Sequence, residues 1–387
     1  MISRKPQPKK KDEEIHISQS GDVQAIREAI NTQLKSNVAT EVKDKSVIVI
    51  PSGILSMDLA VGNGGLVAGR IMDIYGWEGT GKTLLCMSIA ASIQRQYKID
   101  AAGKQVRRIV AMLDAEGTFS KEFATSAGLN TDELILVQST PECILSGEKF
   151  FDIMVLLLGR GIDYMIVDSC PALTPSSVIV NDMGFGQKAQ PAQLMAAGLS
   201  KISPLVNANG QTLVHFINQK RGKPMSGPYE RPEQETGGNA LKFFSSYRFE
   251  VVRATDIIKK VLGIDGVYRE KKVGVNSCVR IIKNKTGPIP PYITGTTYHF
   301  DFDVYFELFR DEDGIEYHRG IDICKDYCAT GLRVGVIKQN SSWFSFGNLK
   351  ANGMNDLIIK IKEKPEIMNE IRGEVFDKMG SKPISSV

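Results

Sequence analysis

Apolar and polar positions alternate along residues 47–290 in a pattern that is typical of an α/β fold. Apolar, β-rich runs predict strands at 70–75, 108–114, 134–138, 164–168, 212–218 and 247–253. Helices of ten or more residues are predicted for most of the gaps, for example at 83–97, 147–159 and 192–207. This alternation predicts a mostly parallel sheet with helices on both faces, which binds ligands at the carboxyl ends of its strands.

The region before this core contains one short helical pattern. Residues 22–36 place Val23, Ile26, Ile30 and Leu34 at helical spacing, which predicts an amphipathic helix. Two placements are open for it, because its apolar face can pack on its own core or on a neighbouring subunit.

A Pro-rich segment at 287–291 is followed by a different pattern. It contains a β-rich part at 296–309, a helix near 321–329, short strands near 334–338 and 343–346, and a helical tail. We therefore expect three parts, namely residues 1–46 with a basic tail and the amphipathic helix, an α/β core at 47–290, and a small α+β C-terminal domain at 291–387.

Composition and charge restrict the class of protein only moderately. The chain has 387 residues and a net charge of +4, and residues 1–11 carry five cations and no acid. Such a run is either a solvated tail or a nucleic-acid-binding arm. We expect a cytoplasmic protein with reduced cysteines, because no apolar run resembles a secretory signal or is long enough to cross a bilayer. Cys324 and Cys328, near His318, fit helix packing better than a metal site.

A glycine-rich segment directly after the strand at 70–75 carries the strongest chemical signal. It matches the phosphate-loop pattern, in which backbone N–H groups and the following helix N-terminus surround an anion. Lys82 is then expected to reach the β- and γ-phosphates, and the Thr83 hydroxyl to ligate Mg²⁺. The predicted nucleotide-binding segment consists of Gly76, Trp77, Glu78, Gly79, Thr80, Gly81, Lys82 and Thr83.

Two further carboxylates are predicted at the same edge of the sheet. Asp168 ends the strand at 164–168, where it can hold Mg²⁺ through water beside a phosphate loop. Glu116 lies just beyond the strand at 108–114, where it can orient or deprotonate a water in line with the γ-phosphate. Asp114 is expected to form structural hydrogen bonds at that strand end.

Three polar side chains at other strand ends have two interpretations each. Gln219 ends the strand at 212–218, so it is either a strand cap or a γ-phosphate sensor that changes the following segment. Lys283 and Lys285 emerge on one face of a strand, because side chains alternate with a period of two. They form either a solvated edge or a two-pronged phosphate clamp.

The order of these motifs resembles that of a RecA-type homologous recombinase over residues 47–290. The similarity is carried by the segments 52–65, 76–83, 114–116, 167–175, 216–219, 236–243 and 283–285. The resemblance implies an α/β phosphate-loop NTPase core, ATP and Mg²⁺ as cofactors, and self-association into a helical filament. It also implies that single-stranded DNA and homologous double-stranded DNA are the partners, with single-strand-binding or loader proteins as further candidates.

The resemblance also implies roles for individual residues. Glu116 is the catalytic carboxylate, Gln219 the nucleotide-sensing switch, and Phe123 the aromatic that stacks on adenine. Lys283 and Lys285 reach across a subunit interface to a neighbour's γ-phosphate, and the helix at 22–36 is the subunit-docking arm.

Two long polar segments, 174–191 and 220–238, resemble the family's two DNA-binding loops. They are only modestly basic, so many subunits of a filament must add their contacts, and backbone N–H groups at glycines can bind phosphates. Met183 is an apolar residue that can wedge between bases. The predicted DNA-binding residues are Met183, Lys188, Lys220, Arg221, Lys223, Arg231, Gly237 and Gly238.

Some positions differ from the family pattern. Ser120 stands where the family commonly has an Asp that contacts the adenine amine, and Trp77 replaces the usual Pro. The stretches at 98–107 and 254–275 are longer than expected, and residues 366–387 do not form an acidic tail.

Taken together, these features favour an ATP-dependent strand-exchange protein with DNA-stimulated ATP hydrolysis. A hexameric replicative helicase and a recombination mediator that does not exchange strands are the alternatives. The paired lysines and the lack of an evident primase-binding domain argue against the helicase, whereas Glu116 and the two complete loops argue against the mediator.

Overall fold

The computed structural model describes residues 23–40, 47–100, 102–180, 189–222, 233–287 and 298–380. The chain divides into two compact units, residues 1–46 and 47–387. In the first unit, helix α1 (Val23–Leu34) is the amphipathic helix that the sequence predicts. The Asn31 side chain holds the segment after it, because its Oδ1 accepts the backbone N–H groups of Val38 (2.9 Å) and Ala39 (2.8 Å).

The second unit is built on one large sheet. The strands from β11 through β3, β9, β8 and β6 to β7 run parallel to their neighbours, whereas β12, β13 and β16 are antiparallel. The predicted α/β fold with a mostly parallel sheet is therefore confirmed. In spatial order the strands are β16 (Gly320–Ile321), β13 (Tyr298–Tyr305), β12 (Tyr268–Asn284), β11 (Tyr247–Leu262), β3 (Arg70–Gly76), β9 (Leu213–Gly222), β8 (Tyr164–Asp168), β6 (Val110–Asp114) and β7 (Leu134–Gln138).

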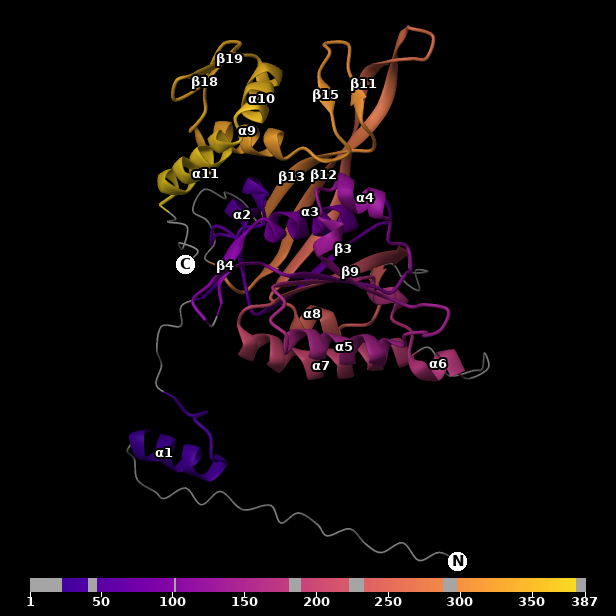
Figure 1. Cartoon of the computed structure of the whole chain (residues 1–387), viewed down its shortest axis with the longest axis vertical. Coiled ribbons are helices and arrows are strands. Elements are labelled where there is room, and N and C mark those ends of the chain that lie inside the picture. The colour runs from indigo at the N-terminus through magenta and orange to yellow at the C-terminus, as the bar shows by residue number, and fades with distance from the viewer. Residues whose placement is uncertain are drawn as a thin grey trace, which may run out of the picture. The chain divides into compact units, whose positions relative to one another are not determined.

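Helices cover both faces of this sheet. Helix α3 (Lys82–Gln94) lies on one side, and α5 (Gly147–Leu158) and α7 (Gln190–Asn209) lie on the other (Figure 1). Within β6, Val110 and Met112 join the core on the α3 side, whereas Ala111 and Leu113 join the core on the α5 and α7 side. All of β6 is buried, as expected for a parallel strand between two helical layers.

Short elements connect the layers. The helix predicted at 83–97 ends earlier, at Gln94, because a small antiparallel hairpin begins at Tyr97. The short elements are β1 (Val49–Ile50), α2 (Leu55–Ala60), β2 (Leu66–Val67), β4 (Tyr97–Ile99), β5 (Gln105–Arg107), α4 (Lys121–Ser126), α6 (Ser176–Val180), β10 (Glu233–Glu235) and α8 (Ala240–Phe244).

Strands β11 and β12 extend well beyond the strand predicted at 247–253. They stay paired from Tyr247 and Asn284 out to Leu262 and Tyr268, which accounts for the long stretch at 254–275. The hairpin β14 (Phe309–Arg310) and β15 (Glu316–Tyr317) lies beside this projecting arm (Figure 1). The two hairpins share a small apolar core that includes Val273, Tyr305, Phe309 and Tyr317.

The C-terminal residues form a small α+β layer with its own core. It consists of α9 (Ile323–Val334), β17 (Lys338–Asn340), β18 (Trp343–Phe346), β19 (Leu349–Asn352), α10 (Met354–Glu363) and α11 (Glu366–Lys378). The strand predicted near 334–338 begins later, at Lys338, because α9 continues to Val334 and is capped by Gly335, whose φ of 77° is left-handed. The boundary at residue 291 stays a prediction, although β13 pairs with β12 in the large sheet.

Two buried contacts join this layer to α2. Arg372 Nη1 of α11 donates to Asp58 Oδ2 over 2.6 Å, and the Leu55 backbone N–H donates to Asp326 Oδ2 over 2.7 Å. Leu55 belongs to the apolar core of the C-terminal layer. The layer is therefore attached to the sheet unit by both polar and apolar contacts.

Candidate functional site

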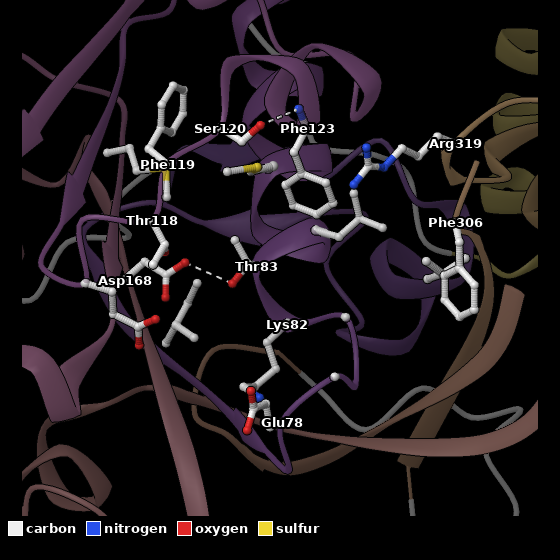
Figure 2. A pocket seen from close by; sticks show the side chains of 18 of the residues that line it. Glu78, Lys82, Thr83, Thr118, Phe119, Ser120, Phe123, Asp168, Phe306 and Arg319 are labelled. Carbon is white, nitrogen blue, oxygen red and sulfur yellow. Dashed lines mark hydrogen bonds between the residues drawn. The ribbon is translucent and has the colours of Figure 1, made fainter. Parts of the chain in front are cut away.

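A cavity of about 450 Å³ lies at the carboxyl ends of the central strands. Parallel strands bring their carboxyl ends to one edge, so residues that are distant in sequence meet there. Figure 2 shows Lys82 and Glu78 at one end of this cavity and Phe123, Arg319 and Phe306 toward the other. Its lining includes Glu78, Gly79, Gly81, Lys82, Thr83, Glu116, Ser120, Phe123, Asp168, Gln219, Phe306 and Arg319.

The glycine-rich segment forms a tight loop between β3 and α3. A Cβ atom at Gly76 would lie 2.3 Å from the Val251 carbonyl oxygen, so only glycine fits there. Gly81 has a φ of 88° and precedes the first residue of α3. The first N–H groups of α3 have no acceptor within the helix and are available to an anion.

Two side chains of this loop form hydrogen bonds with the loop backbone. Thr80 Oγ1 and Lys82 Nζ both donate to the Trp77 carbonyl oxygen, over 2.8 and 2.7 Å. Gly76, Trp77 and Thr80 do not line the cavity and instead shape the loop. Ser277 of β12 supports the loop from outside, because its hydroxyl donates to the Thr80 carbonyl oxygen over 3.2 Å.

Lys82 lies in a partly desolvated, acidic setting. Burial lowers the pKa of Lys82, and the carboxylates of Asp168, Glu116 and Glu78 oppose that shift. An ammonium group surrounded by little water interacts strongly with added negative charge. Lys82 is thus placed to bind a phosphate.

Thr83 and Asp168 form the pair that fits a magnesium ion. Thr83 Oγ1 donates to Asp168 Oδ2 over 2.9 Å. Burial raises the pKa of Asp168 to about 6, and Glu116 and Asp114 add to the shift. One hydroxyl and one carboxylate are typical protein ligands of Mg²⁺, which takes its other oxygens from water and phosphate. The described residues contain no cluster of three or more His, Cys, Asp or Glu that suits a metal ion.

Glu116 is held at the cavity by two neighbouring side chains. Ser169 Oγ donates to Glu116 Oε1, and Gln219 Nε2 donates to the same oxygen over 3.3 Å. The neighbouring Asp114 accepts the N–H groups of Gly117 and Phe119, both over 2.9 Å. Asp114 is therefore structural, as expected, whereas Glu116 points to the cavity.

The end of β9 connects the cavity to the second predicted DNA loop. The Asn218 side chain accepts from Thr236 Oγ1 over 2.7 Å and donates to the Thr236 carbonyl oxygen over 3.2 Å. Strand β10 also pairs with β9 from Glu235 and Lys220 outward. The two ends of this loop are therefore held together beside Gln219. Sequence reasoning did not assign Asn218 or Thr236 to the site.

The described end of the second predicted DNA loop packs against α7, the helix that follows the first predicted loop. A Cβ atom at Gly238 would lie 3.0 Å from Ala192 Cβ, and one at Gly237 would lie 3.4 Å from Met195 Cγ. Arg221 is exposed, whereas Lys220 Nζ contacts Glu250 Oε1 in an ion pair. The other predicted DNA-binding residues, Met183, Lys188, Lys223 and Arg231, lie outside the described residues.

Lys283 and Lys285 lie apart from the cavity of their own chain, since neither lines it. Lys283 Nζ donates to the carbonyl oxygens of Lys242 (2.6 Å) and Phe243 (3.3 Å), at the end of α8. Burial and then the nearby Lys285 lower the pKa of Lys283. The two cations are thus close together, and a role in phosphate binding stays a prediction.

The end of the cavity away from Lys82 is aromatic. Phe123 of α4 lines this end, and its stacking on adenine stays a prediction. Ser120 Oγ caps α4 by accepting the Phe123 N–H over 3.2 Å. Sequence reasoning missed Phe306 and Arg319, which also line this end. The Arg319 guanidinium lies 4.9 Å from the centre of the Phe123 ring (Figure 2). No local motif marks either residue.

Cys324 and Cys328 are the two cysteines for which helix packing and a metal site were the alternatives. Cys328 is buried in the core of the C-terminal layer, and Cys324 Sγ contacts Met368 Sδ, so both pack apolar side chains. Over the part of the chain that the structure describes, no helix has the length and hydropathy of a membrane span.

Comparison with known proteins supports the resemblance that the motifs carry. The family model of the RecA N-terminal domain matches residues 24–301. The protein named Protein RecA from Geobacter sulfurreducens is 32% identical over 336 residues, which are 86% of each chain. Those from Thermus thermophilus (33% identical, 88% of each chain) and Bdellovibrio bacteriovorus (34% identical, 87% of this chain and 78% of that protein) are similarly related. This chain belongs to the RecA family of recombinases.

Proposed function

We propose that this recombinase hydrolyses ATP in the cavity at the phosphate loop and uses the γ-phosphate to control its binding of single-stranded DNA. The observation that carries the proposal is the convergence of Lys82, the Thr83–Asp168 pair and Glu116 on one cavity. These are the groups that phosphoryl transfer to water requires, namely a cation for phosphate, a metal-binding pair and a water-orienting carboxylate.

Each residue has a separate role in this reaction. The N–H groups at the start of α3 and Lys82 bind the β- and γ-phosphates. Thr83 and Asp168 would hold Mg²⁺, which supplies positive charge to the transferred phosphoryl group. Glu116 accepts a proton from water as the water oxygen bonds to the γ-phosphorus. The bond from that phosphorus to the β–γ bridging oxygen then breaks, and ADP and phosphate leave.

Gln219 senses whether a γ-phosphate is bound. The Gln219 amide lines the cavity. Its neighbour Asn218 is hydrogen-bonded to Thr236, the residue that follows β10. Gln219 can exchange its hydrogen bond with Glu116 for one with the γ-phosphate, which moves the start of the loop. The loop then presents Arg221 and the N–H groups near Gly237 and Gly238 to DNA phosphates.

Filament formation supplies the contacts that one subunit lacks. Two apolar positions of α1, Val23 and Leu34, are exposed, which suits docking on a neighbouring subunit. Lys283 and Lys285 are proposed to reach the γ-phosphate of that neighbour, because they lie apart from their own cavity. Many weak DNA contacts per filament then give tight binding to single-stranded DNA and pairing with a homologous duplex.

The test is ATP turnover by the full chain with and without single-stranded DNA. We expect Mg²⁺-dependent hydrolysis that DNA stimulates, and its loss in Lys82→Ala. Turnover that DNA does not change, or a Lys82→Ala variant with wild-type turnover, would contradict the proposed function.

A further inference from the structure

The far end of the nucleotide cavity has a chemical character that differs from the phosphate end. The acidic side chains among its described lining residues are Glu78, Glu116 and Asp168. Asp168 pairs with Thr83, Glu116 with Gln219, and Glu78 lies beside Lys82 (Figure 2). All three therefore belong to the phosphate end, and no carboxylate among the described lining residues faces the base.

Arg319 is the charged side chain at the base end. Gly320 pairs with Tyr305 across β16 and β13, so Arg319 and Phe306 are neighbours just past the end of this ladder. The guanidinium lies 4.9 Å from the Phe123 ring centre, against the aromatic surface proposed to carry the base. Arg319 Nη1 forms an ion pair with Glu122 Oε1 over 3.7 Å, and Glu122 is 89% exposed, so this pair is weak and solvated.

The hydrogen-bonding capacity of these side chains discriminates between purines. A guanidinium has five N–H donors and no acceptor. The 6-amino group of adenine needs an acceptor, whereas O6 and N7 of guanine form an acceptor pair that arginine binds with two hydrogen bonds. The nearby Ser120 hydroxyl is engaged in capping α4.

We propose that Arg319 recognises the nucleotide base, and that the cavity binds purine triphosphates with a 6-carbonyl group, such as GTP, with an affinity comparable to that for ATP. Phe123 and Phe306 supply stacking surface that does not distinguish adenine from guanine. The hydrogen bonds that Arg319 donates to guanine then replace the contact that an ATP-selective site would make with the 6-amino group of adenine. This inference rests on the proposed function, because it assigns the base end of the same cavity.

The experiment measures equilibrium dissociation constants of ATP, GTP and ITP for the full chain with Mg²⁺. In the wild type, the GTP and ATP constants should lie within about tenfold of each other, and ITP should follow GTP because it keeps O6 and N7. Arg319→Ala should weaken GTP and ITP relative to ATP by about tenfold or more, since a bidentate base contact is lost. Arg319→Lys keeps the charge and should recover only part of that loss.

Arg310→Ala is the matched control. Arg310 lies on the adjacent hairpin, is 71% exposed and pairs with Glu316, so its loss removes the same charge outside the cavity. It should leave the ratio of the GTP and ATP constants unchanged.

Three results would overturn the inference. These are a wild type that binds GTP more than about tenfold more weakly than ATP, an ITP constant that follows ATP, and an Arg319→Ala variant with the wild-type ratio. The proposed function fails separately, if neither ATP nor GTP binds. A protein that binds ATP and hydrolyses it with DNA stimulation but rejects GTP refutes the base-end inference alone.

Discussion

Gln219 Nε2 donates a hydrogen bond to Glu116 Oε1 over 3.3 Å. Gln219 lies in β9, Glu116 lies just past the end of β6, and β8 lies between those two strands in the sheet. Glu116 faces the position proposed for the attacking water, and Gln219 begins the segment proposed to contact DNA. One hydrogen bond therefore connects the proposed ATP hydrolysis site with the segment proposed to bind DNA.

Gln219→Ala should reduce the coupling between nucleotide and DNA. Linkage requires that ATP and DNA tighten each other's binding by the same factor, typically about 5–150-fold. We expect that factor to fall toward one in the variant, while ADP affinity changes little. The measurement is single-stranded DNA affinity with a non-hydrolysable ATP analogue and with ADP, at one fixed salt concentration.

The matched control for this variant is Gln211→Ala. Gln211 is an exposed glutamine that precedes the opposite end of β9, so it should keep the wild-type coupling factor. If Gln219→Ala also keeps that factor, Gln219 is a strand cap and the switch lies elsewhere.

Glu116→Gln should separate binding from hydrolysis. Glutamine keeps the oxygen that accepts from Ser169 and Gln219 but is a far weaker base, so the variant should bind ATP and DNA and hydrolyse about 10²–10⁴-fold more slowly. Single-turnover hydrolysis and nucleotide binding are measured together, with the exposed Glu142→Gln as control. Equal losses of binding and turnover would show that Glu116 is structural.

Lys283→Ala combined with Lys285→Ala should abolish DNA-stimulated hydrolysis while ATP binding by each monomer remains. If the lysines act on a neighbour, mixing this variant with Lys82→Ala should restore part of the turnover. In mixed filaments, one subunit supplies the phosphate loop and the next supplies the lysines. Turnover is measured over a series of mixing ratios, and no recovery at any ratio would exclude action between subunits.

Arg372→Ala should destabilise the attachment of the C-terminal layer. It leaves the buried Asp58 carboxylate without its cation, which costs about 3–5 kcal/mol in the free energy of unfolding. Burial already raises the pKa of Asp58 from 3.8, and loss of Arg372 raises it further. A carboxyl group whose pKa is higher in the folded state than in the unfolded state lowers the free energy of unfolding at pH values above the unfolded-state pKa. The destabilisation caused by Arg372→Ala should therefore grow as the pH rises above about 4 and become smaller below it.

Urea unfolding at several pH values tests this prediction. Lys360→Ala is the control, because its pair with Asp356 is about one-third exposed on both sides, so water screens the pair and its loss should change the free energy of unfolding little. A cost for Arg372→Ala that is as small as that of the control, or that does not depend on pH, would contradict the assigned role of the ion pair.

Local sequence patterns were sufficient for the phosphate end of the cavity. The spacing of Gly79, Lys82 and Thr83 encodes the loop directly, and Asp168 and Glu116 follow recognisable buried strands. The parallel fold then brings them together, because carboxyl strand ends share one edge. The central strands could be predicted for the same reason, since they are continuous apolar runs.

The base end and the arm could not be predicted from local patterns. Arg319 reaches the cavity only because β16 pairs with β13, and that pairing is a non-local contact. Strands β11 and β12 extend through residues that are largely exposed, so their length has no apolar run to mark it. The contact of Lys283 with the end of α8 depends on tertiary packing, which no local pattern marks.

The central claim is that this chain pairs homologous DNA under the control of the nucleotide in the Lys82 cavity. The most direct measurement is joint-molecule formation between single-stranded DNA bound by the full chain and a labelled duplex, which is either homologous or unrelated. With ATP we predict joints with the homologous duplex only, none with ADP or with Lys82→Ala, and long-lived joints with Glu116→Gln. Joints that form without regard to homology or nucleotide, or DNA unwinding without pairing, would contradict the account.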